Sequence, residues 1–135
     1  MHQVITKLPY DALLSFGVVA SITATGDSPN ILDIKNNDVL QRFTVVTDVS
    51  AFDRADGNET LSIELEYSND SGMSGAVVKD TYVVPVATEA TGRFTSSVTN
   101  EISGVLYRFC QVRYVLGGTT PDATLESYLS IESIL

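Results

Sequence analysis

The stretch TLSIELEY, residues 60–67, alternates without interruption between apolar and polar side chains. A period of two is that of a β-strand, because successive side chains of a strand point to opposite faces of the sheet. The stretch therefore predicts a half-buried antiparallel strand, with its Leu, Ile and Tyr side chains in a core and its Ser and Glu side chains in solvent. This pattern indicates an all-β protein.

A second strand is predicted immediately upstream, at residues 42–50, which are rich in Phe, Val and Thr. Its core face is expected to carry alternate residues, namely Phe43, Val45, Thr47 and Val49. Between the two strands, residues 51–59 contain the turn signal Asp-Gly-Asn. We therefore expect the two strands to form a hairpin with a long polar loop.

Further strands follow from the same pattern of β-branched and aromatic runs bounded by turn residues. They are predicted at residues 18–25, 31–34, 75–86, 93–98, 105–116 and 123–131, with 105–116 the longest. Many short strands joined by Gly, Pro, Asn and Asp turns indicate an antiparallel β-sandwich or jelly roll. We expect an N-terminal arm at residues 1–10 and a single sandwich domain at residues 11–135.

The amino-acid composition argues against several classes of function. The 135 residues include 8 Lys and Arg against 17 Asp and Glu, a formal net charge of −9. A field of this sign repels phosphate backbones and anionic lipids, so direct binding to nucleic acid or to a membrane is not expected. No apolar stretch approaches the length of a membrane span, and Met1 to Tyr10 lack the features of a signal peptide. The single cysteine, Cys110, excludes an intrachain disulfide and favours a reducing compartment.

The residues that catalysis and metal binding usually need are scarce. His2 is the only histidine, and Cys110 falls on the core face of a predicted strand. The polar residues 53–59 offer oxygen ligands for calcium, but their spacing does not match an EF-hand loop, and a solvated loop is the simpler interpretation. We therefore predict no catalytic residues, no metal and no cofactor, and expect a protein that is not an enzyme.

Five segments, in order along the chain, resemble one protein family. They are residues 11–16 (DALLSF), 19–25 (VASITAT), 28–34 (SPNILDI), 60–68 (TLSIELEYS) and 107–114 (YRFCQVRY). In this order they are similar to the strands of the small jelly-roll capsid cement, or decoration, proteins of tailed bacteriophages. Each segment alone is a weak signal, since alternating strands occur in any sandwich, and it is the ordered combination that resembles the family.

The resemblance implies a structural protein of the virion. Such a protein is made in the host cytoplasm, assembles as a homo-oligomer, dimer or trimer, and binds the outer surface of the phage head over junctions between major capsid protein subunits. It would stabilise the shell against the pressure of packaged DNA, and many modest contacts on a symmetric lattice would add through multivalency.

Two segments are candidates for contact with the capsid or with other copies. One is the apolar part of the arm, with Val4, Ile5, Leu8 and Tyr10; the other is the loop residues Phe52, Asp53 and Arg54. The arm residues are equally suited to packing on their own sandwich.

An alternative function is a carbohydrate-binding jelly roll, such as a tail-spike or lectin-like module. It would need exposed aromatic rings in a groove. Tyr10, Tyr82 and Tyr128 are the candidates for those rings.

Overall fold

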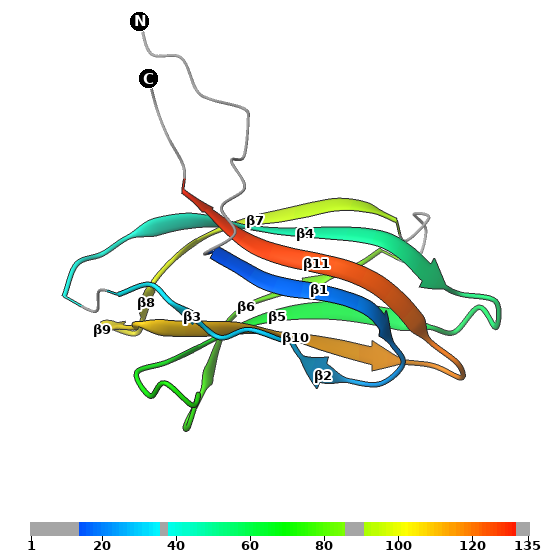
Figure 1. Cartoon of the computed structure of the whole chain (residues 1–135), viewed down its shortest axis with the longest axis horizontal. Coiled ribbons are helices and arrows are strands. Elements are labelled where there is room, and N and C mark those ends of the chain that lie inside the picture. Colours follow the sequence, from blue (N-terminus) through cyan, green and yellow to red (C-terminus); the bar gives the residue numbers. More distant parts are fainter. Residues whose placement is uncertain (1–13, 36–37, 86–90, 132–135) are drawn as a thin grey trace, which may run out of the picture.

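Two antiparallel sheets pack face to face in the computed structural model, which describes residues 14–35, 38–85 and 91–131 (Figure 1). The first sheet contains, in spatial order, β1 (Ser15–Ile22), β11 (Asp122–Ile131), β4 (Arg42–Asp53) and β7 (Gly92–Thr99). The second contains β2 (Gly26–Asp27), β10 (Phe109–Gly117), β5 (Thr60–Ser68) and β6 (Val77–Val83), and β3 (Leu32–Asp33) also pairs with β10. A small hairpin of β8 (Glu101–Ile102) and β9 (Val105–Leu106) lies at one end. The predicted all-β sandwich is confirmed.

The chain passes repeatedly from one sheet to the other. The connections from β1 to β2, from β4 to β5, from β6 to β7 and from β10 to β11 all cross between sheets, and β5 and β6 are sequential strands of one sheet. Strands adjacent in space are therefore mostly distant in sequence. This order of strands is that of a jelly roll.

The core lies between the sheets and is formed where the period-two pattern predicts. Leu61, Ile63, Leu65 and Tyr67 of β5 are all buried in it, which confirms the predicted face of this strand. Phe43, Val45 and Val49 of β4 face them from the other sheet. Burial of such apolar side chains is the main favourable term in the folding of a domain of this size.

The predicted hairpin between residues 42–50 and 60–67 is wrong. β4 pairs with β11 and β7, whereas β5 pairs with β10 and β6, so the two strands belong to different sheets. Strands that follow one another in sequence pair more often than not, and this expectation supported the hairpin. Here the loop carries the chain across the sandwich instead, because β10 matches β5 over its whole length.

The long strand predicted at residues 105–116 is divided in two. β9 ends at Leu106 and β10 begins at Phe109, and at 12 residues β4 is the longest strand. The break arises because the backbone N–H groups of Tyr107 and Arg108 are bound outside the ladder, by Asn100 O at 2.8 Å and Asn69 Oδ1 at 3.0 Å. Beyond the break the alternation holds, with Cys110, Val112 and Tyr114 fully buried.

Candidate interaction surfaces

The predicted contact residues Phe52, Asp53 and Arg54 lie at the end of β4, where the chain leaves the first sheet (Figure 1). Phe52 is half-buried and packs against the core. The Arg54 guanidinium lies 5.5 Å from the centre of the Phe52 ring and donates hydrogen bonds to the carbonyl oxygens of Glu59, at 3.3 Å, and Pro85, at 3.4 Å. Two of the three residues thus hold the loop together, and only Asp53 is exposed.

Glu59 closes this loop from inside. Its side chain is fully buried, although a solvated loop was expected. Oε1 accepts a hydrogen bond from the backbone N–H of Asp56 at 2.8 Å, and Oε2 accepts one from Asn58 at 3.0 Å. The carboxylate therefore satisfies two backbone donors of the turn, which is how a buried charged group is tolerated.

The same loop is fixed against the segment after β10. Asn58 exchanges two hydrogen bonds with Thr119, at 2.8 and 3.1 Å, and Thr120 Oγ1 donates to Asp56 Oδ2 at 2.5 Å. A side chain at Gly118 would bring its Cβ to 2.6 Å from Glu59 Cα, so these two loops are in close backbone contact.

We call this end of the sandwich the acidic end, defined by Asp53, Asp56 and Asp122. Asp53 and Asp122 are register partners on neighbouring strands, and they line a shallow depression beside Phe52. Across residues 14–35, 38–85 and 91–131, no three His, Cys, Asp or Glu side chains are grouped in a way that could hold a metal ion. The acidic end is a surface with three exposed carboxylates, those of Asp53, Asp56 and Asp122.

The arm residues Val4, Ile5, Leu8 and Tyr10 lie outside the described residues. The point where the arm joins the domain is defined, because Ser15 at the start of β1 pairs with Tyr128 near the end of β11. The arm therefore joins the sandwich at the end opposite to the acidic end.

That opposite end carries an exposed apolar surface, which we did not predict. Val39 and Leu40 are 54% and 60% exposed, and Val105 in the β8–β9 hairpin is 45% exposed. We call this the apolar end, defined by these three residues. The one signal in the sequence is an adjacent apolar pair in a segment that otherwise reads as a polar connection, and exposed apolar clusters on soluble proteins commonly mark interaction sites.

Asn100 holds the apolar end in place. Its side chain is fully buried, with Nδ2 donating to Val39 O at 3.0 Å and Oδ1 accepting from Gln41 N–H at 2.8 Å. Its backbone N–H donates to Gln41 O at 3.2 Å, and its carbonyl accepts from Tyr107 N–H at 2.8 Å. The segment that displays Val39 and Leu40 is consequently tied to the β7–β8 connection by three hydrogen bonds of Asn100.

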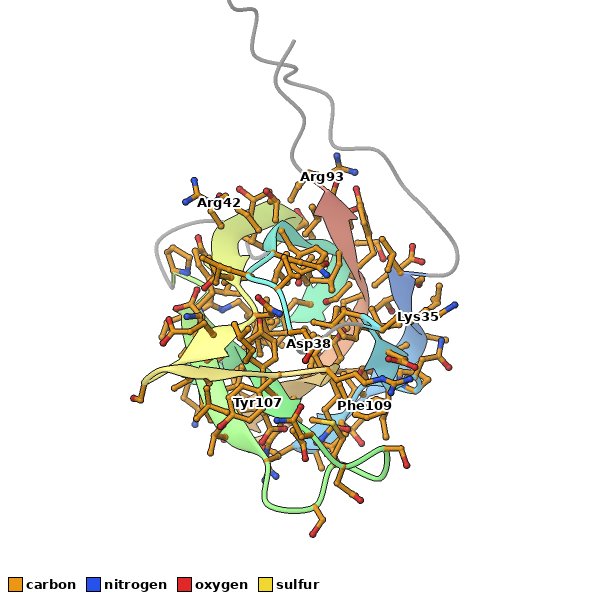
Figure 2. All side chains as sticks on the ribbon, turned by 90° about the vertical axis from the view of Figure 1, so that its left-hand side faces the viewer. Lys35, Asp38, Arg42, Arg93, Tyr107 and Phe109 are labelled. Carbon is orange, nitrogen blue, oxygen red and sulfur yellow. The ribbon has the colours of Figure 1, made fainter. Side chains whose placement is uncertain are left out.

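Positive charge accompanies this apolar surface in an otherwise acidic chain. Figure 2 looks onto this end, where exposed Lys35 and Arg42 lie on either side of Asp38. Arg108 forms an ion pair with Asp33, at 2.8 Å, and this hydrogen-bonded guanidinium lowers the pKa of the Asp33 carboxyl. The two ends of the sandwich thus differ in charge as well as in polarity.

Cys110 is a core residue, as predicted. It is fully buried, and burial raises the pKa of its thiol far above the usual range. A thiol that stays protonated is a poor nucleophile and a poor metal ligand.

No protein-family model matches the chain, and no curated protein matches its sequence. In the part of the chain that the structure describes, no helix has the length and apolar character to cross a membrane.

Proposed function

We propose that this protein is a capsid cement protein of a tailed bacteriophage. In this proposal it binds the outer surface of the head as a homo-oligomer, dimer or trimer, at junctions between major capsid protein subunits, and stabilises the shell without any chemical step. The ordered resemblance of five segments to that family, 11–16, 19–25, 28–34, 60–68 and 107–114, supports the family assignment.

The exposed side chains of the apolar end support the choice of this end as the docking surface. Val39, Leu40 and Val105 expose apolar side chains on a framework that Asn100 has already ordered. A preformed surface loses little conformational entropy on binding, which favours affinity from a small contact. The flanking Lys35 and Arg42 suit a capsid surface that is apolar at its centre and acidic at its edge.

The acidic end is the less favoured docking surface. Phe52 and Arg54 are engaged within the fold, and exposed carboxylates such as Asp53 and Asp56 are strongly hydrated. This end would instead face solvent on the assembled head, where negative charge keeps particles soluble.

The alternative, a carbohydrate-binding module, receives little support from the aromatic side chains. Tyr82 packs on Phe94 with ring centroids 5.3 Å apart, and Tyr128 is only 3% exposed. Neither ring therefore presents an open face to a sugar, and Tyr10 lies outside the described residues.

Binding to capsids tests the proposal. Purified protein is mixed with expanded capsids that lack decoration, the capsids are pelleted, and bound copies are counted. We expect saturable binding at a fixed number of copies per capsid and survival of the capsids at higher temperature. Absence of binding, together with a signal on a sugar array, would favour the carbohydrate-binding alternative.

Matched substitutions test the docking surface separately. Val39→Asp places a charge on the apolar end, whereas Val83→Asp places the same charge on β6 at a side chain that is 61% exposed. We expect Val39→Asp to weaken capsid binding by about 10-fold or more, as loss of a buried contact at an interface does, and Val83→Asp to leave it unchanged. Equal loss from both variants, or from neither, would exclude the apolar end as the docking surface.

A further inference from the structure

A narrow slot leads into the core between β6 and β7, which are the last strands of their sheets on one side of the sandwich (Figure 1). Its inner part is lined by core side chains of the neighbouring strands, Val45 of β4 and Ile63 and Leu65 of β5. Tyr82 of β6 and Phe94 of β7 also line it, with ring centroids 5.3 Å apart. The lining of the slot is therefore mostly apolar.

Among the described residues that line the slot, Asp80 of β6 is the one that carries a charge. It is the register partner of Leu65, and because directly opposed residues of two strands share a face, its carboxylate points into the sandwich. Oδ1 accepts a hydrogen bond from the Thr81 backbone N–H at 3.0 Å, and Oδ2 accepts one from Ser96 Oγ of β7. A carboxylate thus lies half-buried at the point where the two edge strands meet.

The charge of Asp80 is not balanced by a cation. Both of its donors are neutral, and the two ion pairs of the described residues, Arg93 with Asp48 and Arg108 with Asp33, do not include it. An ionised carboxylate can accept up to about four hydrogen bonds, so Asp80 can accept more. A cationic donor that enters the slot would therefore form a strong, charge-assisted bond.

The β7 edge can also pair with a further strand. The pairing of β7 with β4 runs over all eight residues of β7 without a register shift. By contrast, the register of the edge strand β1 is interrupted twice, and that of β6 is interrupted beside Asp80. Interrupted edges resist the addition of a strand, whereas a long regular edge accepts one. Among the described edge strands, β7 is the one that is both long and regular.

The slot and the β7 edge meet at Ser96. Ser96 is the register partner of Val45, so its side chain faces the core, and its hydroxyl contacts Asp80. A strand added to β7 would lie about 4.8 Å away and would also point alternate side chains toward the core. The side chain opposite Ser96 would consequently enter the slot beside Asp80.

The size of the slot restricts which side chain can enter. The free space in the slot is about 20 Å³, and a group of the size of a water molecule needs about 10–15 Å³. The ammonium group of lysine is of this size and stands on an unbranched apolar stem, which suits the apolar lining. The planar guanidinium of arginine is larger, and an aromatic ring would bring no charge to Asp80.

We propose that β7 binds an extended segment of another protein by strand addition, and that a lysine of this segment enters the slot and pairs with Asp80. In such binding the main-chain hydrogen bonds supply affinity, and the pocket selects the side chain. The net charge of −9 favours the approach of a basic segment. The inference does not rest on the proposed function, because the β7 edge is separate from the apolar end.

Matched peptides test the proposal on the unaltered protein. The capped peptide Thr-Val-Thr-Lys-Thr-Val-Thr carries Val and Lys on one face of a strand and Thr on the other, in either direction of binding. We expect it to shift the backbone amide resonances of β7 and β6 in an NMR titration. A peptide with norleucine in place of lysine keeps the apolar stem without the charge, and should bind about 10-fold or more weakly. Equal affinity of the two peptides would overturn the proposal.

Substitutions in the protein test the role of Asp80. Asp80→Asn removes the charge and keeps an oxygen that can accept the Ser96 bond, so the lysine peptide should bind it as weakly as the norleucine peptide does. Asp122→Asn is the matched control, because it removes an exposed carboxylate at the acidic end, and it should leave binding unchanged. Equal losses in the two variants would assign the binding to general attraction by an acidic protein and would contradict the proposal.

N-methylated peptides test strand addition itself. Methyl groups on the Val and Lys nitrogens block the N–H groups along one edge of the peptide, and methyl groups on the Thr nitrogens block the other edge. A strand added to β7 uses one edge, so one of the two peptides should lose binding and the other keep it. Equal binding of the two would overturn strand addition. Absence of any shift with the lysine peptide would overturn the proposal as well, and a dimer detected by sedimentation in that case would assign the β7 edge to a second copy of this chain.

Discussion

The Tyr114 hydroxyl donates a hydrogen bond to Ser127 Oγ at 2.8 Å, and this bond joins the two sheets through the core. Ser127 Oγ in turn lies 2.7 Å from Thr47 Oγ1, and the hydrogen bonds of all three residues are buried. A connected set of this kind satisfies every hydroxyl and specifies how one sheet is placed on the other.

Removing members of this set should have graded effects on stability. Tyr114→Phe deletes one hydrogen bond and leaves Ser127 bound to Thr47, so we expect a loss of about 1 kcal/mol in the free energy of unfolding. Ser127→Ala leaves two buried hydroxyls without their partner, and should cost about 2–3 kcal/mol. Urea denaturation measures both values. A larger loss from Tyr114→Phe than from Ser127→Ala would contradict this account.

Stability should fall in alkaline solution. Burial raises the pKa of Tyr114 from its ordinary value near 10 to about 12, with the Ser127 hydrogen bond offsetting part of the rise. Burial likewise raises the pKa of Tyr67 and of the Cys110 thiol. Between about pH 9 and 12 the unfolded chain therefore releases protons that the folded chain retains, and the stability present below pH 9 is progressively lost.

Denaturation midpoints measured from pH 8 to 11 would show this loss. In Tyr114→Phe one titrating group is absent, so the slope above pH 10 should be shallower by about 1.4 kcal/mol per pH unit. An unchanged slope in that variant would mean that Tyr114 titrates normally in the folded protein.

Gly118 should tolerate no side chain. Its φ of +101° favours glycine, and an added Cβ would lie 2.6 Å from Glu59 Cα and 2.7 Å from Asn58 O, both backbone atoms that cannot move independently. We expect Gly118→Ala to destabilise the fold by about 3 kcal/mol or more. Gly57→Ala is the matched control, because Gly57 also has a positive φ but has open space around it, and it should cost only about 1 kcal/mol. Similar losses of stability in Gly118→Ala and Gly57→Ala would show that the loop after β10 and the loop between β4 and β5 separate easily.

Asn100 should contribute more to the stability of the fold than an exposed asparagine with a similar number of hydrogen bonds. Asn100→Ala leaves Gln41 N–H and Val39 O without their partner at a buried site, and we expect it to cost about 2–4 kcal/mol. Asn69→Ala also removes a donor and an acceptor, to Leu106 O and Arg108 N–H, but Asn69 is exposed and water replaces the bonds. Thermal unfolding of the two variants makes the comparison. Equal melting temperatures would mean that the apolar end is not held by Asn100.

The strands themselves follow from local sequence. In β5 the alternation of Leu61, Ile63, Leu65 and Tyr67 with polar residues is enough to predict both the strand and its buried face. The same holds for Cys110, Val112 and Tyr114 of β10. Period-two patterns report side-chain direction, which depends only on the backbone geometry of the strand itself.

Pairing between strands depends on the tertiary structure. The signal Asp-Gly-Asn marks a turn correctly, but it does not distinguish a hairpin from a passage between sheets, and the outcome here depends on β10 pairing with β5. The burial of Glu59 and Asn100 could not be predicted either, because each satisfies backbone groups of a turn or of a distant segment.

The sequence by itself therefore determined the fold class, most of the strands and the core faces, since these arise from contacts between each residue and its near neighbours. Only the tertiary structure decided which strands are neighbours, and it alone brought Val39, Leu40 and Val105 to one end and buried Val46 with Tyr128 on an outer face. These features arise from contacts between residues far apart in the chain, for which local periodicity carries no information.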